Sequence, residues 1–319
     1  MPIKYKQLLT SAMQMILHHK YLWFFGLFSA FLTGGFSYRI DDGSFLYNWQ
    51  QLQSTGIFDL SIFSKITELA QVNPTGLIVQ ASILIAVIIL GLFLLWLAIV
   101  SQGALINSVS KIDSNKKTDF SDGLQAGKKH FWAIFFFRAL ERVVIVALLL
   151  VVLVSAFATL AVSQQIFIRL IYYIATVVVI ILIFLLAIAV RYAIFYQVIK
   201  DLRFIESLQA GFWLLKRNFL ASIEAGIIIF AVSFVLGFLV LMLLAATVIP
   251  FAFLLFIFFK LAFNAVLMAV LITGIITLFI LIVIIGGILG AFNDIYWTLV
   301  FLQVAKNNPK SIIRSVFSA

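Results

Sequence analysis

Residues 77–100 read LIVQASILIAVIILGLFLLWLAIV and contain no charged side chain. About 20 consecutive apolar residues are enough for a helix to cross the hydrocarbon core of a bilayer. The same composition runs through the chain, in which 64% of the residues are hydrophobic and 11% are charged, whereas soluble domains are about 25% charged. The sequence therefore predicts an all-α polytopic membrane protein with a single membrane domain over residues 1–319.

Six apolar runs are candidate transmembrane helices, and no polar stretch between them is long enough to fold separately in water. The run from Phe219 to Ala305 has only Glu224, Lys260 and Asp294 as charges and could hold two or more crossings. We expect two crossings there, joined by an apolar outer-side turn or half-helix. The predicted spans are residues 21–38, 77–108, 131–162, 170–199, 219–248 and 271–305.

Basic residues predict the orientation, because Lys and Arg in short loops stay on the cytoplasmic side. All but four of the 22 basic residues fall on the side that holds both termini, the exceptions being Arg39, Lys65, Arg169 and Lys260. We therefore expect cytoplasmic N- and C-termini and an even number of spans. The net charge of +10 would then face anionic lipid headgroups, which argues against nucleic-acid binding.

One tetrapeptide, LQAG, occurs at residues 124–127 and again at 208–211. Each copy lies in a longer pattern of an amphipathic segment, a basic and aromatic cluster with a tryptophan, and an apolar span. The same pattern occurs a third time, without LQAG, at the start of the chain. We expect a threefold repeat of one elbow helix in the interface plane plus one helical hairpin. The predicted elbow helices are residues 4–19, 121–130 and 202–216, and the predicted interface anchors are Trp23, Trp132, Trp213 and Trp297. The polar outer loop, residues 37–76, either caps the outer face or connects along the lipid.

Ionisable residues inside the hydrocarbon region are costly and indicate a functional site or a structural pair. At 1.5 Å per residue, six of them fall in the cytoplasmic half of their spans and could meet as one buried network. The network would serve an anion, a lipid headgroup or an ion pathway; the alternative is structural pairing or snorkelling to the headgroups. Its members are Arg138, Glu141, Arg142, Arg191, Glu224 and Asp294. The spacing of Arg138 and Arg142 also suits a phosphate held between them.

Small residues on the last span, Gly286, Gly287, Gly290 and Ala291, allow another helix to approach closely. That helix belongs either to this chain or to a second copy in a homodimer. The three histidines lie at the predicted cytoplasmic interface without the spacing of a metal site, so we expect no metal. The chain contains no cysteine and no hydrolase, nucleotide-binding or cofactor-binding motif. We therefore expect neither catalysis nor a cofactor.

Several short motifs occur along most of the chain: HHKYLWFFG at residues 18–26, GALI at 103–106, LQAG followed by Phe131-Trp132, RYA at 191–193 leading to Asp201, Glu206 with LKRNF at 215–219, and YWTL at 296–299. This set resembles a bacterial six-span membrane protein family related to the membrane domain of glycerophosphoryl diester phosphodiesterase. The resemblance implies the bacterial inner membrane and an envelope or lipid context. It transfers no catalytic residue, because no phosphodiesterase barrel accompanies these motifs, and Glu141 and Asp294 have no counterpart in the family pattern.

The sequence thus favours a non-catalytic integral membrane protein that acts as a scaffold or accessory and engages membrane lipids or membrane partners. The alternative is a transporter or channel for a small solute, an ion or a lipid, which the buried charges would suit. Transporters often unwind a span at Gly or Pro near the midplane, and here only Pro250 lies near a span, at its outer end.

Overall fold

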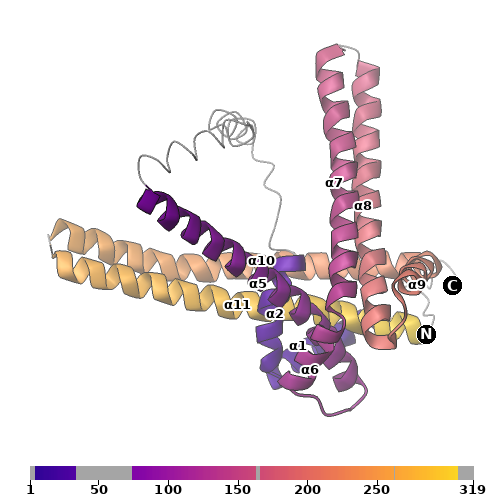
Figure 1. The fold of residues 1–319 in the computed structure, drawn as a ribbon, viewed down its shortest axis with the longest axis horizontal. Coiled ribbons are helices and arrows are strands. Elements are labelled where there is room, and N and C mark those ends of the chain that lie inside the picture. Colours follow the sequence, from indigo (N-terminus) through magenta and orange to yellow (C-terminus); the bar gives the residue numbers. More distant parts are fainter. Residues whose placement is uncertain (1–3, 34–73, 163–165, 262, 308–319) are drawn as a thin grey trace. The chain divides into compact units, whose positions relative to one another are not determined.

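The computed structural model describes residues 4–33, 74–162, 166–261 and 263–307, and all regular structure among them is α-helical (Figure 1). The prediction of an all-α chain is confirmed. Most of the predicted outer loop, and the end of the first predicted span, lie outside the described residues. The helices are α1 Tyr5–His18, α2 Tyr21–Thr33, α5 Pro74–Asp113, α6 Phe120–Lys129, α7 Phe131–Val162, α8 Ile166–Lys200, α9 Phe204–Arg217, α10 Phe219–Lys260 and α11 Asn264–Asn307.

The chain forms two compact units. The smaller one, residues 31–97, contains the first half of α5, where every side chain from Ile78 to Leu95 is exposed. A helix that is apolar on all sides and exposed on all sides is stable in lipid and not in water. The larger unit comprises residues 1–30 and 98–319 and contains the remaining helices.

Three short helices, α1, α6 and α9, form where the elbow helices are expected, and one or two residues separate each of them from the apolar helix that follows. Local capping explains the boundaries of two of them. The Asp119 side chain accepts a hydrogen bond from the Asp122 backbone N–H, 2.8 Å away, at the start of α6. At the start of α9 the Arg203 N–H donates to the Glu206 carboxylate at 3.3 Å.

The apolar stripe of α1 packs inside the larger unit, where α1 contacts α11. Tyr5, Leu8, Ala12 and Ile16 are buried, at the spacing of one helical face. On another face Leu17 is 55% exposed. The stripe that suggests membrane binding in the sequence is therefore used for packing inside this unit.

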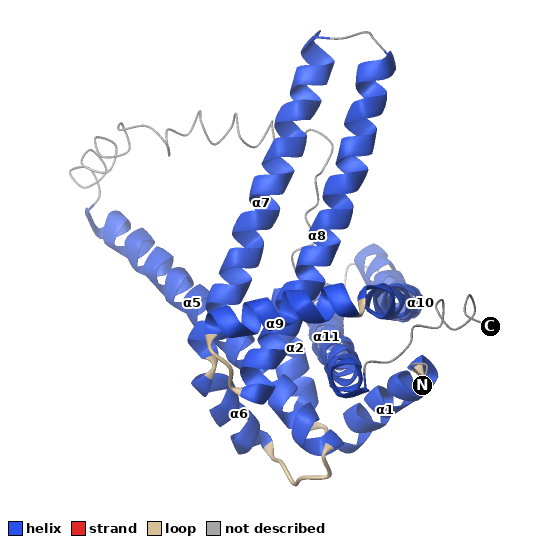
Figure 2. Ribbon diagram, turned by 90° about the vertical axis from the view of Figure 1, so that its right-hand side faces the viewer, coloured by secondary structure: helices blue, strands red, loops and turns tan. Residues whose placement is uncertain are grey.

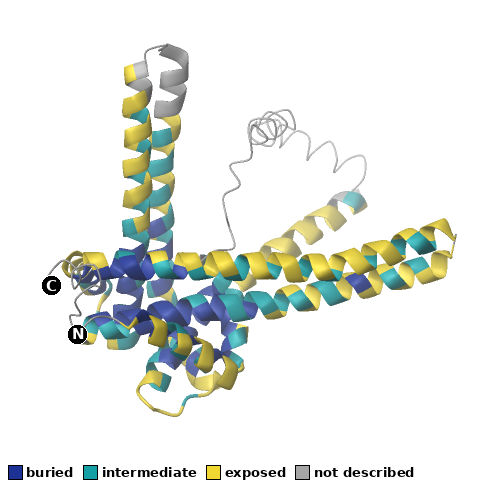
Figure 3. Cartoon of the chain, turned by 180° about the vertical axis from the view of Figure 1, so that it is seen from behind, coloured by how far each residue is buried: buried dark blue, intermediate teal, exposed yellow. Residues whose placement is uncertain are grey.

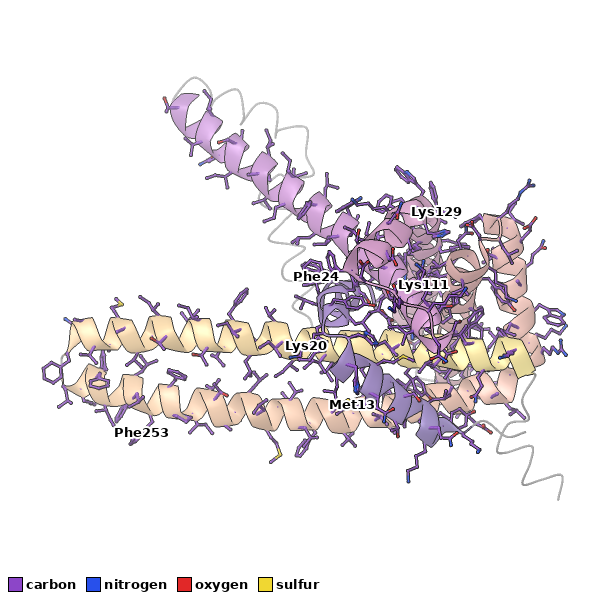
Figure 4. All side chains as sticks on the ribbon, turned by 90° about the horizontal axis from the view of Figure 1, so that it is seen from below. Met13, Lys20, Phe24, Lys111, Lys129 and Phe253 are labelled. Carbon is purple, nitrogen blue, oxygen red and sulfur yellow. The ribbon has the colours of Figure 1, made fainter. Side chains whose placement is uncertain are left out.

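The core of the larger unit is built from the ends of long helices (Figure 3). Its buried side chains come mainly from the carboxyl-terminal turns of α5, α8 and α11 and from the first turns of α7 and α10. The outer parts of the α7–α8 and α10–α11 hairpins are mostly exposed and apolar. Figure 4 shows the side chains of the second hairpin, including Phe253, which is 63% exposed.

Four helical segments are long and apolar enough to cross a membrane: Ile78–Asp113, Leu170–Lys200, Phe219–Lys260 and Asn264–Lys306. A shorter apolar helix covers Tyr21–Leu32. The remaining long helix, α7, carries Arg138, Glu141 and Arg142 within its first turns. These segments make the chain an integral membrane protein, with α2 and α7 as further candidates for spans.

The α10–α11 hairpin is longer than the predicted spans 219–248 and 271–305. Helix α10 continues through Pro250 to Lys260, and α11 begins at Asn264. The expected turn within residues 250–270 is thus confined to the residues between the two helices. At 1.5 Å per residue, the 42 residues of α10 extend about 63 Å, roughly twice the thickness of a bilayer hydrocarbon core.

Candidate functional site: the buried polar layer

Arg138 and Glu141, one turn apart on α7, form the first part of a buried polar layer. The Arg138 Nη1 lies 2.7 Å from the Glu141 carboxylate, and its Nε donates to Gln102 of α5 at 3.1 Å. Arg138 is 8% exposed and Glu141 7% exposed. The Nη2 of Arg138 is buried and has no hydrogen-bond partner among the described residues. The pair cancels its own charge where an isolated charge would be costly.

Arg191 of α8 and Asp294 of α11 form the second part. The Arg191 Nη1 donates to Asn293 at 3.3 Å, and the guanidinium lies over the Trp297 ring, 5.0 Å from its centroid. Asp294 is 3% exposed and accepts a hydrogen bond from the Ser29 hydroxyl of α2. Arg191 also interacts electrostatically with Asp294, Arg138 and Glu141. Two cations and two anions therefore balance each other in this layer.

Glu224 of α10 is bound separately, by Tyr5 of α1. The Tyr5 hydroxyl lies 2.8 Å from the Glu224 carboxylate and 3.2 Å from the Ala221 carbonyl. Burial, and then the hydrogen bond to Glu224, raise the pKa of Tyr5 well above its ordinary value. Tyr5 therefore stays protonated and remains a donor.

Two more tyrosines contact the same turns of α10. The Tyr192 hydroxyl lies 3.0 Å from the Ser222 hydroxyl, and Tyr296 donates to the Ala225 carbonyl at 3.2 Å. Both tyrosines are fully buried. The first turns of α10 are thus fixed by hydroxyl groups from α1, α8 and α11.

The structure therefore brings together four of the six predicted network residues: Arg138, Glu141, Arg191 and Asp294. Glu224 is buried beside Tyr5, and Arg142 is half-buried. Two of the three guanidinium nitrogens of Arg138 are used by Gln102 and Glu141, so a phosphate between Arg138 and Arg142 stays a prediction. Sequence reasoning missed the neutral partners Gln102, Asn293, Ser29 and Tyr5. Only Gln102 and Asn293 give a signal, as polar side chains within apolar runs.

The small residues of α11 contact α2 of the same chain. A Cβ on Gly26 would lie 2.3 Å from the Gly287 carbonyl oxygen, and one on Gly290 would lie 2.1 Å from the Gly26 carbonyl oxygen. The nearest atom to a Cβ on Gly286 would be Leu27 Cδ1 at 3.4 Å. Of the two uses predicted for Gly286, Gly287, Gly290 and Ala291, the intrachain one is present.

The glycines of the two LQAG motifs, Gly127 and Gly211, also allow two helices to approach each other closely. A Cβ on Gly127 would lie 2.1 Å from the Val100 carbonyl oxygen of α5, and one on Gly211 would lie 2.7 Å from the Ala189 carbonyl oxygen of α8. Each glycine thus lets a short helix approach the backbone of the long helix that precedes it. Figure 2 shows α9 lying across α8, which it crosses at Gly211.

The predicted tryptophan anchors differ in their surroundings. Trp132 is 66% exposed and Trp213 is 56% exposed, so both can reach a membrane interface. Trp23 is half-buried, and its indole N–H donates a hydrogen bond to the Ile16 carbonyl at 2.9 Å. Trp297 is 4% exposed. Its prediction as an interface anchor is wrong, because its ring packs beneath Arg191 instead.

A salt bridge at the surface joins the elbow before α7 to the end of α8. Lys129 Nζ lies 2.5 Å from the Asp201 carboxylate, and the buried His130 lies 3.8 Å from it. Burial lowers the pKa of His130, with Asp201 opposing the shift, and Lys129 lowers the pKa of Asp201. Within the described part of the chain, no group of three or more His, Cys, Asp or Glu side chains could bind a metal.

Comparison of the chain with protein-family models, with curated proteins and with solved structures gave no match. The fold and the apolar helices thus define the class of the protein, an all-helical integral membrane protein. Its particular function is inferred from its own residues.

Proposed function

We propose that the chain is a non-catalytic scaffold or accessory protein of the bacterial cytoplasmic membrane that engages lipids or other membrane proteins. The observation that carries this proposal is the pairing inside the buried polar layer. Arg138 binds Glu141, Ser29 binds Asp294, and Tyr5 binds Glu224. Groups that satisfy one another rigidify a joint between helices, as a scaffold requires, and offer few free atoms to a substrate.

The proposed architecture has six spans, cytoplasmic termini and three units of an elbow helix plus a hairpin. The order of helix contacts supports the repeat: α6 packs on α5 and α9 on α8, each through an LQAG glycine. The first elbow, α1, packs on the last helix, α11. Every elbow thus packs on the long helix that ends the preceding unit, and the first and last units close the series.

The relationship to the six-span family of the glycerophosphoryl diester phosphodiesterase membrane domain is part of the same proposal. It rests on the motifs quoted above. Among these, the glycines of LQAG and the aromatic residues of YWTL fall at packed positions of the fold, since Gly127 and Gly211 lie against neighbouring helices and Tyr296 and Trp297 are buried. The family context supports an envelope or lipid role and supplies no catalytic residue.

Cysteine accessibility tests the topology in a chain that has no native cysteine. Single cysteines placed at Lys116 and Lys310 are expected to resist an impermeant thiol reagent in intact cells and to react after lysis. Labelling of either position from outside would overturn the proposed orientation. Native mass spectrometry from membranes tests the function, with retained lipids or protein partners as the expected result.

Transport of a small solute, an ion or a lipid is the second candidate function. A cavity of about 510 Å³ favours it, at the carboxyl ends of α5, α8 and α11, with Asp113, Lys200 and Lys306 among its lining residues. Purified protein in liposomes decides between the two functions. Movement of an ion or lipid that Glu224→Gln abolishes would replace the scaffold proposal with transport.

A further inference from the structure

An apolar groove of about 470 Å³ lies between α7, α8, α9 and the start of α10. Its walls include Leu148 of α7, Leu186 of α8, and Phe212 and Phe219 on either side of the α9–α10 junction. Among the residues that the structure describes, Lys216 is the only charged side chain that lines it. The volume is within the range of about 300–1,000 Å³ typical of small-molecule sites.

The groove lies at the boundary between the packed core and the apolar part of the α7–α8 hairpin. Helix α9 crosses α8 where Gly211 meets Ala189 and Ala193. The α8 residues that line the groove, from Leu182 to Leu186, lie beyond this crossing, toward the exposed apolar part of α8. The groove therefore joins the charged end of α9 at Lys216 to the apolar surface of the hairpin.

The charge at the rim is positive and available. Lys216 is exposed, and it forms no ion pair or hydrogen bond within the described part of the chain. The neighbouring Arg217 places its guanidinium 4.8 Å from the centroid of the Trp213 ring, and this ring is 56% exposed. Two cations beside an exposed tryptophan are typical of a protein surface at the level of lipid headgroups.

We propose that this groove binds an anionic glycerophospholipid, with one acyl chain against Leu148 and Leu186 and the phosphate on Lys216. The inference rests on the proposed lipid-engaging function and assigns it a site and a lipid charge. The apolar walls provide affinity for any acyl chain, while the ammonium group of Lys216 selects against headgroups without net negative charge. Helix α9 then links lipid binding to the packing of α8 through the close contact at Gly211.

Native mass spectrometry of the full chain in detergent, titrated separately with phosphatidylglycerol and phosphatidylcholine, tests the site. We expect Lys216→Gln to weaken phosphatidylglycerol binding about tenfold, which corresponds to about 1.4 kcal/mol, and to weaken phosphatidylcholine binding less, because the choline cation already offsets the charge of its phosphate. Leu186→Trp fills the groove and is expected to weaken both lipids. The matched control is Lys128→Gln on α6, which removes an exposed cation from an equivalent elbow without touching the groove.

If the Lys216→Gln variant and the Lys128→Gln control bound phosphatidylglycerol equally well, the proposed site would be wrong. Equal affinity of the natural chain for both lipids would overturn the selectivity for negative charge. Because Lys216 is exposed, its substitution tests binding without disturbing the core. Either result would leave the scaffold proposal standing if the natural chain still retained lipids or partners from membranes, whereas retention of neither would refute the scaffold proposal itself.

Discussion

Gly290→Ala is expected to destabilise the protein far more than Gly286→Ala, although both changes add one methyl group to α11. At position 290 the new Cβ would lie 2.1 Å from the Gly26 carbonyl oxygen and 2.9 Å from the Ala30 Cβ. At position 286, of the atoms that the structure describes, it would meet only the end of the flexible Leu27 side chain, at 3.4 Å. The new methyl group at position 290 meets backbone atoms, which cannot rotate away. The one at position 286 meets a side chain, which can.

The expected cost follows from the movement that the clash requires. Helices α2 and α11 must part by about 1 Å, which forfeits a quarter to a half of the dispersion energy of the separated atoms. Overpacking of this kind costs about 1–3 kcal/mol. Loss of the hydrogen bond from Ser29 to the buried Asp294 adds about 1–3 kcal/mol. We therefore expect about 2–6 kcal/mol of destabilisation for Gly290→Ala. Gly286→Ala should be neutral, or stabilising by up to about 1 kcal/mol through helix propensity.

Thermal unfolding in detergent, followed by size-exclusion chromatography with fluorescence detection, measures the difference. A shift of about 2–4 °C per kcal/mol places Gly290→Ala well below Gly286→Ala. Gly237→Ala on α10, where the new Cβ has no described atom within 4 Å, is a second control. Similar melting temperatures for the substitutions at 286 and 290 would refute the proximity of α2 and α11, and so would a more stable Gly290→Ala variant.

Three further predictions concern the buried polar groups. Tyr5→Phe removes one hydrogen bond from the buried Glu224 carboxylate and should cost about 1–3 kcal/mol in the free energy of unfolding, whereas Tyr173→Phe at a 64% exposed position should cost nothing measurable in the same thermal assay. Arg138→Met should cost about 3–5 kcal/mol by leaving Glu141 unpaired, and addition of Glu141→Leu should recover much of that loss; a double variant no more stable than the single one would contradict the pairing. Because burial lowers the pKa of His130, its stabilising contribution is present above the ordinary pKa of about 6.5 and is lost as the pH falls below it. The natural chain should therefore lose more stability than His130→Gln between pH 7 and pH 5, and parallel pH profiles would disprove this.

The helical class of the chain follows from hydropathy alone, because apolar runs of this length have one stable solution in lipid. The bounds of α7 match the predicted span 131–162, since its two ends are marked by a basic and aromatic cluster and by a polar connection. The bounds of α10 and α11 could not be obtained in this way. Hydropathy does not change between Val248 and Leu271, so nothing in the composition shows where one helix ends and the next begins.

The buried polar layer could be predicted only in part. Depth along each helix places Arg138, Arg191 and Asp294 at similar levels, but it does not show which face of a helix a side chain occupies. The pairing of Glu224 depends on Tyr5, which reads in the sequence as one member of an interfacial apolar stripe. Trp297 was misread for the same reason, because an aromatic residue near a helix end suits a lipid interface and a core contact equally well.

The contact between α2 and α11 has a consequence for the biogenesis of the protein. Ser29 and Asp294, which form a hydrogen bond, are 265 residues apart in the chain. At a synthesis rate of roughly 5–20 residues per second, the ribosome needs about 13–53 s to produce the partner of Ser29 after Ser29 itself. During that interval the surface of α2 around Gly26 must be shielded by lipid or by the insertion machinery. The first helices to be made are therefore among the last to be fixed in place.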